Sequence, residues 1–242
     1  LIRAMEARLF QRLGPLPRPV LDVGCGDGHF AEVVWGEMDV GVDLDSASLR
    51  EAQRRAVYDS LCLASATTLP FADQSFASAV SNCVIEHIPE MPRVLAEVCR
   101  VLKPDGLFVF SVPTNSLNDH LSITRLLAAL DAGELAERYK SWFTRMQVHF
   151  HMYSPDRWAS LAEEAGFEVL EHTGYMSARA AALFDLGHFY GIPNLISRRL
   201  TGRWVPLPWR PRFALEERLL APLVAEHDPP SATCYFFVAR KR

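Results

Sequence analysis

A glycine-rich turn between two apolar elements carries the clearest chemical signal in the chain. Residues 20–30 read Val-Leu-Asp-Val-Gly-Cys-Gly-Asp-Gly-His-Phe, so a strand-like run ends in Gly24, Gly26 and Gly28. Glycine lets a backbone turn sharply and approach a ligand with no Cβ in the way. Asp43 ends the next apolar run, and in a doubly wound sheet these two strand ends are neighbours. A carboxylate there can accept hydrogen bonds from both hydroxyls of a ribose, so the pair predicts a site for an adenosine-type ligand.

The glycine spacing also bears on the kind of nucleotide. Dinucleotide-binding dehydrogenases favour G-x-G-x-x-G, in which the third glycine permits close helix–strand packing. In this chain the third glycine comes one residue early, at Gly28, and His29 follows it. A nicotinamide oxidoreductase is therefore disfavoured.

Three histidines are candidates for a general base. His87 follows the apolar run 79–83, where it would face the ligand, or it would be a loop histidine that bonds the backbone. His149 and His151 precede Ser154, and in an extended segment both would point to the same side, either in a substrate lid or as structural histidines. Two histidines without a third ligand in place are weak support for a metal site, so no metal is expected.

Alternating apolar runs and helical patterns must position these groups. An amphipathic helix is predicted over 1–13, and short strands alternate with helices up to residue 113, which favours a parallel α/β sheet. Ser154 and Pro155 predict a helix start, and Gly166 its end. The predicted strands are 20–24, 39–43, 61–64, 79–83, 106–113, 167–170 and 233–239, and the predicted helices between them lie near 28–36, 46–58, 90–102 and 155–165.

Two long segments interrupt this pattern. Residues 114–152 are rich in aromatic and apolar side chains, and one helix is predicted there, over about 123–139. Such a segment would suit a cap that excludes water over a small or lipid-like acceptor. Residues 176–230 form the second insertion. We expect 1–242 to be a single domain that carries both insertions.

Composition excludes several other classes of protein. The chain has 242 residues, 49% of them apolar, with 25 basic against 29 acidic side chains. These values are typical of a globular protein and disfavour a generally basic nucleic-acid-binding protein. The five cysteines form no C-x-x-C pair, which argues against a disulfide framework or zinc knuckle and favours the cytoplasm.

The charge is unevenly distributed. Five arginines and no acidic residue lie between Asp185 and Glu216, and Trp204 and Trp209 fall within the same stretch. Residues 198–212 are therefore a candidate contact for an anionic ligand or a peripheral membrane surface, or else a solvated loop.

Several blocks in fixed order resemble one enzyme family. The chain is similar to the class I S-adenosylmethionine (SAM)-dependent methyltransferases, in particular the type-11, UbiE-like group. The resemblance implies a Rossmann-like α/β fold whose seven-stranded, mostly parallel sheet has an antiparallel last strand, together with helical cap insertions. The blocks that carry it are 20–30, 40–43, 69–71, 75–76, 81–88, 100–106, 149–155 and 164–167.

The resemblance also implies residue roles. The glycine loop would pass under the methionine part of SAM, and Asp22 would hold that loop and the cofactor's amino group. Asp43 would bind the ribose and Leu44 would pack on adenine. The cofactor-binding residues are expected to be Asp22, Gly24, Cys25, Gly26, Gly28, Asp43, Leu44, Ser65, Ala66, Asn82 and Cys83, and the catalytic candidates His87 and His149.

Two positions depart from the family pattern. Relatives often carry aspartate where this chain has Ser65 and Ala77, and a neutral serine is a weaker acceptor than a carboxylate. These departures support one alternative, a non-catalytic cofactor-binding or interaction protein with the same fold. The favoured function is methyl transfer from SAM to a small-molecule or lipid-like acceptor, with O-methylation slightly ahead and S-adenosylhomocysteine (SAH) as product.

Overall fold

Seven strands form one sheet in the order β3-β2-β1-β4-β5-β7-β6. In this computed structural model, which describes residues 1–187 and 210–242, β7 runs antiparallel to β5 and β6, whereas the β1–β2, β1–β4, β2–β3 and β4–β5 pairs are parallel. The strands are β1 Val20–Val23, β2 Met38–Asp43, β3 Tyr58–Leu63, β4 Phe76–Asn82, β5 Leu102–Pro113, β6 Phe167–Tyr175 and β7 Cys234–Lys241. The predicted Rossmann-like sheet with an antiparallel last strand is confirmed.

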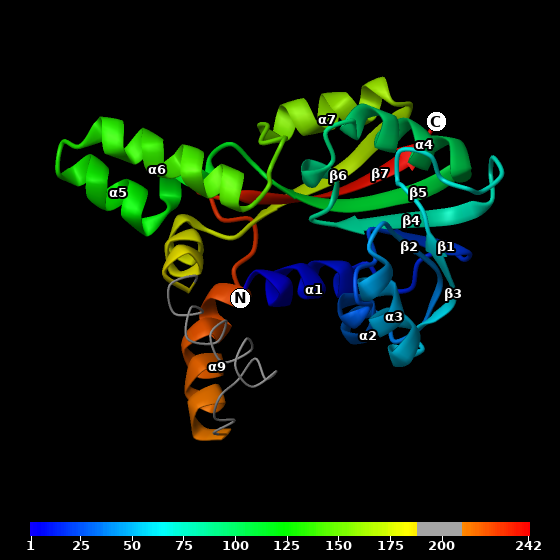
Figure 1. Cartoon of the computed structure of the whole chain (residues 1–242), viewed down its shortest axis with the longest axis horizontal. Coiled ribbons are helices and arrows are strands. Elements are labelled where there is room, and N and C mark those ends of the chain that lie inside the picture. Colours follow the sequence, from blue (N-terminus) through cyan, green and yellow to red (C-terminus); the bar gives the residue numbers. More distant parts are fainter. Residues whose placement is uncertain (188–209) are drawn as a thin grey trace.

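Helices cover both faces of the sheet (Figure 1). On one face lie α1 Ile2–Arg12, α2 His29–Val34 and α3 Ser46–Arg55, and on the other lie α4 Met91–Val101 and α7 Pro155–Glu164. Each face has its own apolar core. Trp158 packs with Phe110 and Phe237 in one, and Phe10 packs with Phe236 in the other.

Local capping explains where two helices begin. The Ser154 hydroxyl accepts a hydrogen bond from the Arg157 N–H at 3.3 Å, and Pro155 occupies the first turn of α7, as the sequence predicts. Asp45 caps α3 by accepting from the N–H groups of Ala47 and Ser48 at 3.0 and 3.1 Å. This cap fixes the chain direction directly after β2.

The first insertion differs from its prediction. The single helix expected over 123–139 is wrong, because two helices, α5 Ser122–Ala129 and α6 Gly133–Met146, stand in its place. The break lies at Asp131, whose φ of 53° is left-handed, and the Ala132 N–H then bonds the Leu127 carbonyl. The two helices form a hairpin beyond the carboxyl end of β5 (Figure 1). Two short 3₁₀ turns are also present, Ile85–His87 after β4 and Leu117–His120 after β5.

The second insertion is described only in part. Residues 178–187 are helical, and α9 spans Arg210–Val224 before β7. The predicted anionic contact at 198–212 falls almost wholly outside the described residues. Among the described residues, none of the helices is long and apolar enough to cross a membrane.

Candidate active site

The loop after β1 folds around the carboxylate of Asp43. Gly24, Gly26 and Gly28 have φ angles of 79°, 54° and 76°, a region that favours glycine. One oxygen of Asp43 accepts the Gly26 N–H at 2.8 Å, and the other accepts the Asp45 N–H at 2.8 Å. The carboxylate therefore ties the glycine loop to the end of β2 while each oxygen keeps acceptor capacity for a ribose hydroxyl.

A cavity of about 170 Å³ opens beside this carboxylate. Leu44, although apolar, is 68% exposed at its edge, and Ala66 is buried in its wall. The remaining lining residues are Gly24, Val42, Asp43, Ala64, Cys83, Val84, His87 and Ile88. A mainly apolar cavity with one carboxylate suits a flat base attached to a ribose, so the residues present fit an adenosine group.

Asp22, near the end of β1, and Cys25, within the glycine loop, are both buried. Asp22 is 7% exposed and accepts a hydrogen bond from the Tyr58 hydroxyl at 2.6 Å. Burial raises the pKa of Asp22 to about 7, against the opposing effect of the Tyr58 bond. Cys25 is buried against Gly41, where a Cβ would lie 2.9 Å from its sulfur. The predicted contact of Asp22 with the cofactor's amino group stays a prediction.

Ser65 is engaged in its own turn. Its hydroxyl lies 2.7 Å from the Thr67 hydroxyl and accepts the Thr67 N–H at 3.2 Å. The neighbouring Ala66, rather than the serine side chain, lines the cavity. The serine therefore shapes the turn that carries Ala64 and Ala66 to the cavity wall.

Asn82 and Cys83, at the end of β4, meet a residue that sequence reasoning missed. Glu6 of α1 is fully buried, and its carboxylate accepts from the Asn82 amide at 2.9 Å, the Cys83 thiol at 3.0 Å and the Tyr175 hydroxyl at 3.1 Å. Arg3 also donates to it, at 2.8 Å. The sequence did hold a signal for this burial, because Glu6 lies four residues after Ile2 and so falls on the apolar face of the predicted first helix.

A second polar cluster joins the turn after β4 to the end of the first insertion. The N–H groups of Phe150 and His151 donate to the Glu86 carbonyl at 2.9 and 3.2 Å, and His87 Nδ1 donates to the Val148 carbonyl at 3.1 Å. This docking brings His87 and His149 together, with ring centroids 4.9 Å apart.

The docked segment also places Glu86 and His151. The Glu86 carboxylate is 3.7 Å from His87 Nε2. His151 does not join the cluster and lies 3.0 Å from the Ile88 carbonyl through Nε2. The structure thus supplies a third group, Glu86, that the sequence did not assign to the two histidines.

Burial governs the protonation of this cluster. Glu86 is 1% exposed, and burial raises its pKa to about 8. Burial lowers the pKa of His149 to about 4, with a smaller contribution from His87, and it lowers the pKa of His87 as well. Both imidazoles are therefore neutral at pH 7 and keep a lone pair for a ligand or a proton.

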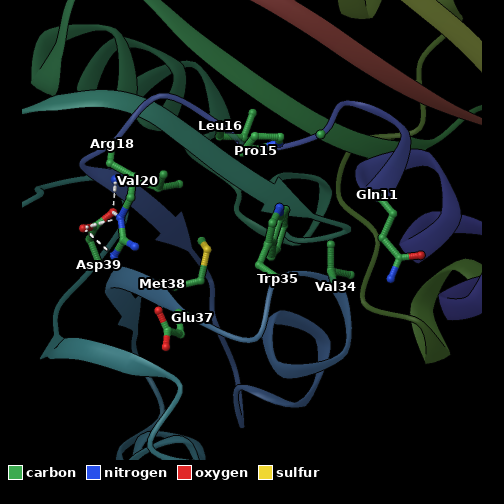
Figure 2. Close-up of a pocket in the computed structure, with 11 residues that line it drawn as sticks. Gln11, Pro15, Leu16, Arg18, Val20, Val34, Trp35, Glu37, Met38 and Asp39 are labelled. Atoms are coloured by element: carbon green, nitrogen blue, oxygen red, sulfur yellow. Dashed lines mark hydrogen bonds and ion pairs between the residues drawn. The ribbon is translucent and has the colours of Figure 1, made fainter.

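A larger cavity, of about 350 Å³, lies at the other end of the strands (Figure 2). It is lined by residues at the amino ends of β1 and β2, among them Val20 and Met38. Its cationic side chain is Arg18, whose Nε donates a hydrogen bond to the Asp39 carboxylate at 2.9 Å, as the dashed lines of Figure 2 show. This cavity is separate from the glycine loop, and ligands of open α/β sheets bind at the carboxyl ends of strands.

The sheet order, the glycine loop and the carboxylate at the end of β2 define a Rossmann-like nucleoside-binding enzyme. A family model described as a methyltransferase domain matches residues 2–172. A protein named uncharacterized methyltransferase from Mycobacterium sp. (strain KMS) is 35% identical over 186 residues, which cover 74% of this chain and 71% of that protein. The chain belongs to the class I SAM-dependent methyltransferases, and its cofactor is SAM.

Two further similarities extend this finding. The 24-methylenesterol C-methyltransferase 2 of Oryza sativa subsp. japonica is 32% identical over 179 residues, covering 70% of this chain and 47% of that protein. The structure of a SAM-dependent methyltransferase from Thermotoga maritima superposes with a TM-score of 0.61 at 16% identity, covering 100% of this chain and 89% of that one. At that identity the likeness concerns the fold alone.

Proposed function

We propose that this methyltransferase transfers the methyl group of SAM to a small-molecule or lipid-like acceptor, with an oxygen favoured as the nucleophile. The single observation that carries the proposal is the convergence of Glu86, His87 and His149 beside the glycine loop, because His87 also lines the cavity there. When bound, SAM supplies an electrophilic methyl group. An enzyme then needs chiefly to align the nucleophile, and an oxygen nucleophile gains from losing its proton.

Asp43 is the residue on which cofactor binding depends in this proposal. Its oxygens would accept the ribose hydroxyls, and Leu44 would cover the adenine. The glycine loop, which Asp22 would help to hold, would pass under the methionine part. Support comes from the double backbone anchoring of the Asp43 carboxylate and from the exposure of Leu44 at the cavity edge.

The two insertions would bind the acceptor. Exposed apolar side chains gather on the α5–α6 hairpin, as expected of a surface that receives an apolar molecule. They are Leu126, Leu130, Leu135, Trp142 and Met146. The rice relative acts on a sterol by its name, which supports a lipid-like acceptor.

The remaining assignments rest on charge and cysteine chemistry. We keep the basic stretch 198–212 as a proposed contact for an anionic ligand or bilayer surface, and nucleic acid is not among the proposed partners. All five cysteines lie in the described residues and are free thiols, which favours a cytoplasmic location.

The test uses the purified full chain. Calorimetric titration with SAM and SAH establishes the cofactor site, and radiolabelled SAM then reports transfer to a panel of hydroxyl, amine and activated-carbon acceptors. Labelling of a hydroxyl acceptor supports the proposal. Cofactor binding without labelling of any acceptor would favour the non-catalytic alternative, and labelling of amines or carbons alone would overturn the choice of oxygen.

A further inference from the structure

Three potential metal ligands converge beside the cofactor cavity. Glu86, His87 and His149 each offer one ligand atom, and these atoms lie within 4.8 Å of one another. Ligands that share one metal ion at bonds of about 2.0–2.2 Å sit roughly 3 to 3.5 Å apart, so small side-chain rotations close the remaining gap.

Glu86 has an oxygen that the protein leaves unused. Its side chain is 1% exposed, and its Oε2 has no hydrogen-bond partner within the part of the chain that the structure describes. A buried carboxyl oxygen without a partner costs free energy, because it has lost its hydration and gained nothing in return. Coordination to a cation would supply the missing partner and displace any proton that the carboxyl group carries.

His149 has a matching free atom. Its Nδ1 is buried and has no hydrogen-bond partner among the residues that the structure describes. The backbone bonds from Phe150 and His151 to the Glu86 carbonyl hold this histidine against the turn after β4. Residues 149 and 86 are therefore positioned together by main-chain contacts rather than by a chance side-chain approach.

His87 is oriented as metal-binding histidines usually are. Its Nδ1 faces the Val148 carbonyl, which can only accept, so this nitrogen carries the proton and Nε2 presents its lone pair toward Glu86. A backbone carbonyl on the second ring nitrogen fixes the tautomer and ring orientation of a metal ligand. The side chain of His87 is 35% exposed, which leaves a path for an ion to enter.

We propose that Glu86, His87 and His149 bind one divalent transition-metal ion. Two imidazoles and one carboxylate form a donor set suited to Zn²⁺, Mn²⁺, Fe²⁺ or Co²⁺. Three protein ligands leave coordination positions open, which is typical of catalytic rather than structural sites. The site adjoins the cavity, because His87 belongs both to the cluster and to the cavity wall.

This site would select an oxygen acceptor, an inference that rests on the proposed function. A hydroxyl coordinated to the ion loses its proton to solvent more readily, because the cation stabilises the resulting negative charge. The oxygen lone pair then forms the bond to the methyl carbon. The carbon–sulfur bond breaks with its electron pair on sulfur, which yields the neutral thioether of SAH.

Metal binding is tested directly on the full chain after treatment with a chelator. Titration with Co²⁺ is followed by visible absorption, and titration with Zn²⁺ by calorimetry, in both cases with one ion per chain expected. Glu86→Gln and His149→Ala should each weaken binding at least about 100-fold, since loss of even an outer-shell partner costs 10- to 100-fold. His120→Ala, a histidine of the first insertion outside the cluster, is the control and should bind the ion as the wild type does.

The outcomes separate this proposal from the proposed function. SAH titration and thermal unfolding show that each variant is folded, and His149→Gln replaces any variant that is not. Absence of metal binding by a chain that binds SAH overturns the metal site, as does unchanged affinity in the folded variants. Methyl transfer to a hydroxyl that persists undiminished in chelator also overturns it while leaving the proposed function intact. Metal binding without transfer to any acceptor would support the metal site and overturn the proposed function.

Discussion

Replacing Asp43 by asparagine tests the nucleoside end of the cavity with the smallest change in shape. The carboxylate accepts the N–H groups of Gly26 and Asp45, both at 2.8 Å, and keeps further acceptor capacity on both oxygens. Asparagine offers one oxygen, and its NH₂ group must face one of those two N–H donors. The variant therefore loses the negative charge, one acceptor for ribose and part of the loop anchoring.

The expected loss follows from the energy of one such bond. A hydrogen bond to a charged group contributes about 1.5–3 kcal/mol. Because about 1.4 kcal/mol corresponds to a tenfold change in affinity, Asp43→Asn should weaken SAH binding roughly 10- to 150-fold. Isothermal titration calorimetry with SAH measures this directly, without any knowledge of the acceptor.

The neighbouring Asp45 provides a matched control. Asp45→Asn removes the same charge two residues away, but asparagine caps a helix about as well as aspartate, and Asp45 does not line the cavity. Its SAH affinity should stay within about threefold of the wild type, because only an exposed charge outside the cavity changes. If folded Asp43→Asn also binds SAH within about threefold of the wild type, the ribose role of Asp43 is refuted.

Three further variants test other parts of the site. Leu44→Ser should change the free energy of unfolding by no more than about 0.5 kcal/mol, because Leu44 is 68% exposed, yet weaken SAH binding in the same calorimetric assay; equal affinity would remove Leu44 from the adenine site. His87→Ala should lower kcat severalfold more than it lowers SAM affinity, and unchanged turnover would leave His87 structural. Burial raises the pKa of Asp22 from 3.8 to about 7, so the proton-linked stability it provides is complete below pH 3.8 and is lost as pH rises through 7. The melting temperature of Asp22→Asn should therefore fall less between pH 5 and 8 than that of the wild type. Parallel falls in the two melting temperatures would contradict the raised pKa.

Much of the fold could be predicted because its signals are local. Short apolar runs separated by helical patterns specify a parallel sheet, and Ser154 with Pro155 marks a helix start within two residues. The break between α5 and α6 could not be predicted, because Asp131 adopts a left-handed conformation that few non-glycine residues favour and no glycine or proline occupies 130–132. The residues 123–139 alone read as one continuous amphipathic pattern.

The two ends of the cavity also differ in how far the sequence predicts them. The nucleoside end is built from consecutive residues at two adjacent strand ends, so spacing along the chain places Asp43 against the glycine loop. The other end joins groups that are remote in sequence. Glu6 meets Cys83 across 77 positions, and His87 bonds Val148 across 61. Spacing carries no information at such separations, and only the folded chain shows that Glu86 lies beside both histidines.

This difference has a consequence for specificity. In the proposed function, the residues that would bind the cofactor lie at the ends of shared strands and in the loops that follow them, whereas Glu6 comes from α1 and His149 from the end of the first insertion. Changes in those two segments are therefore expected to alter the acceptor without disturbing the contacts of Asp43. On this proposal the choice of nucleophile would depend on how the insertion docks through the Glu86 carbonyl, whereas the strand-end motifs that predict SAM binding do not depend on that docking.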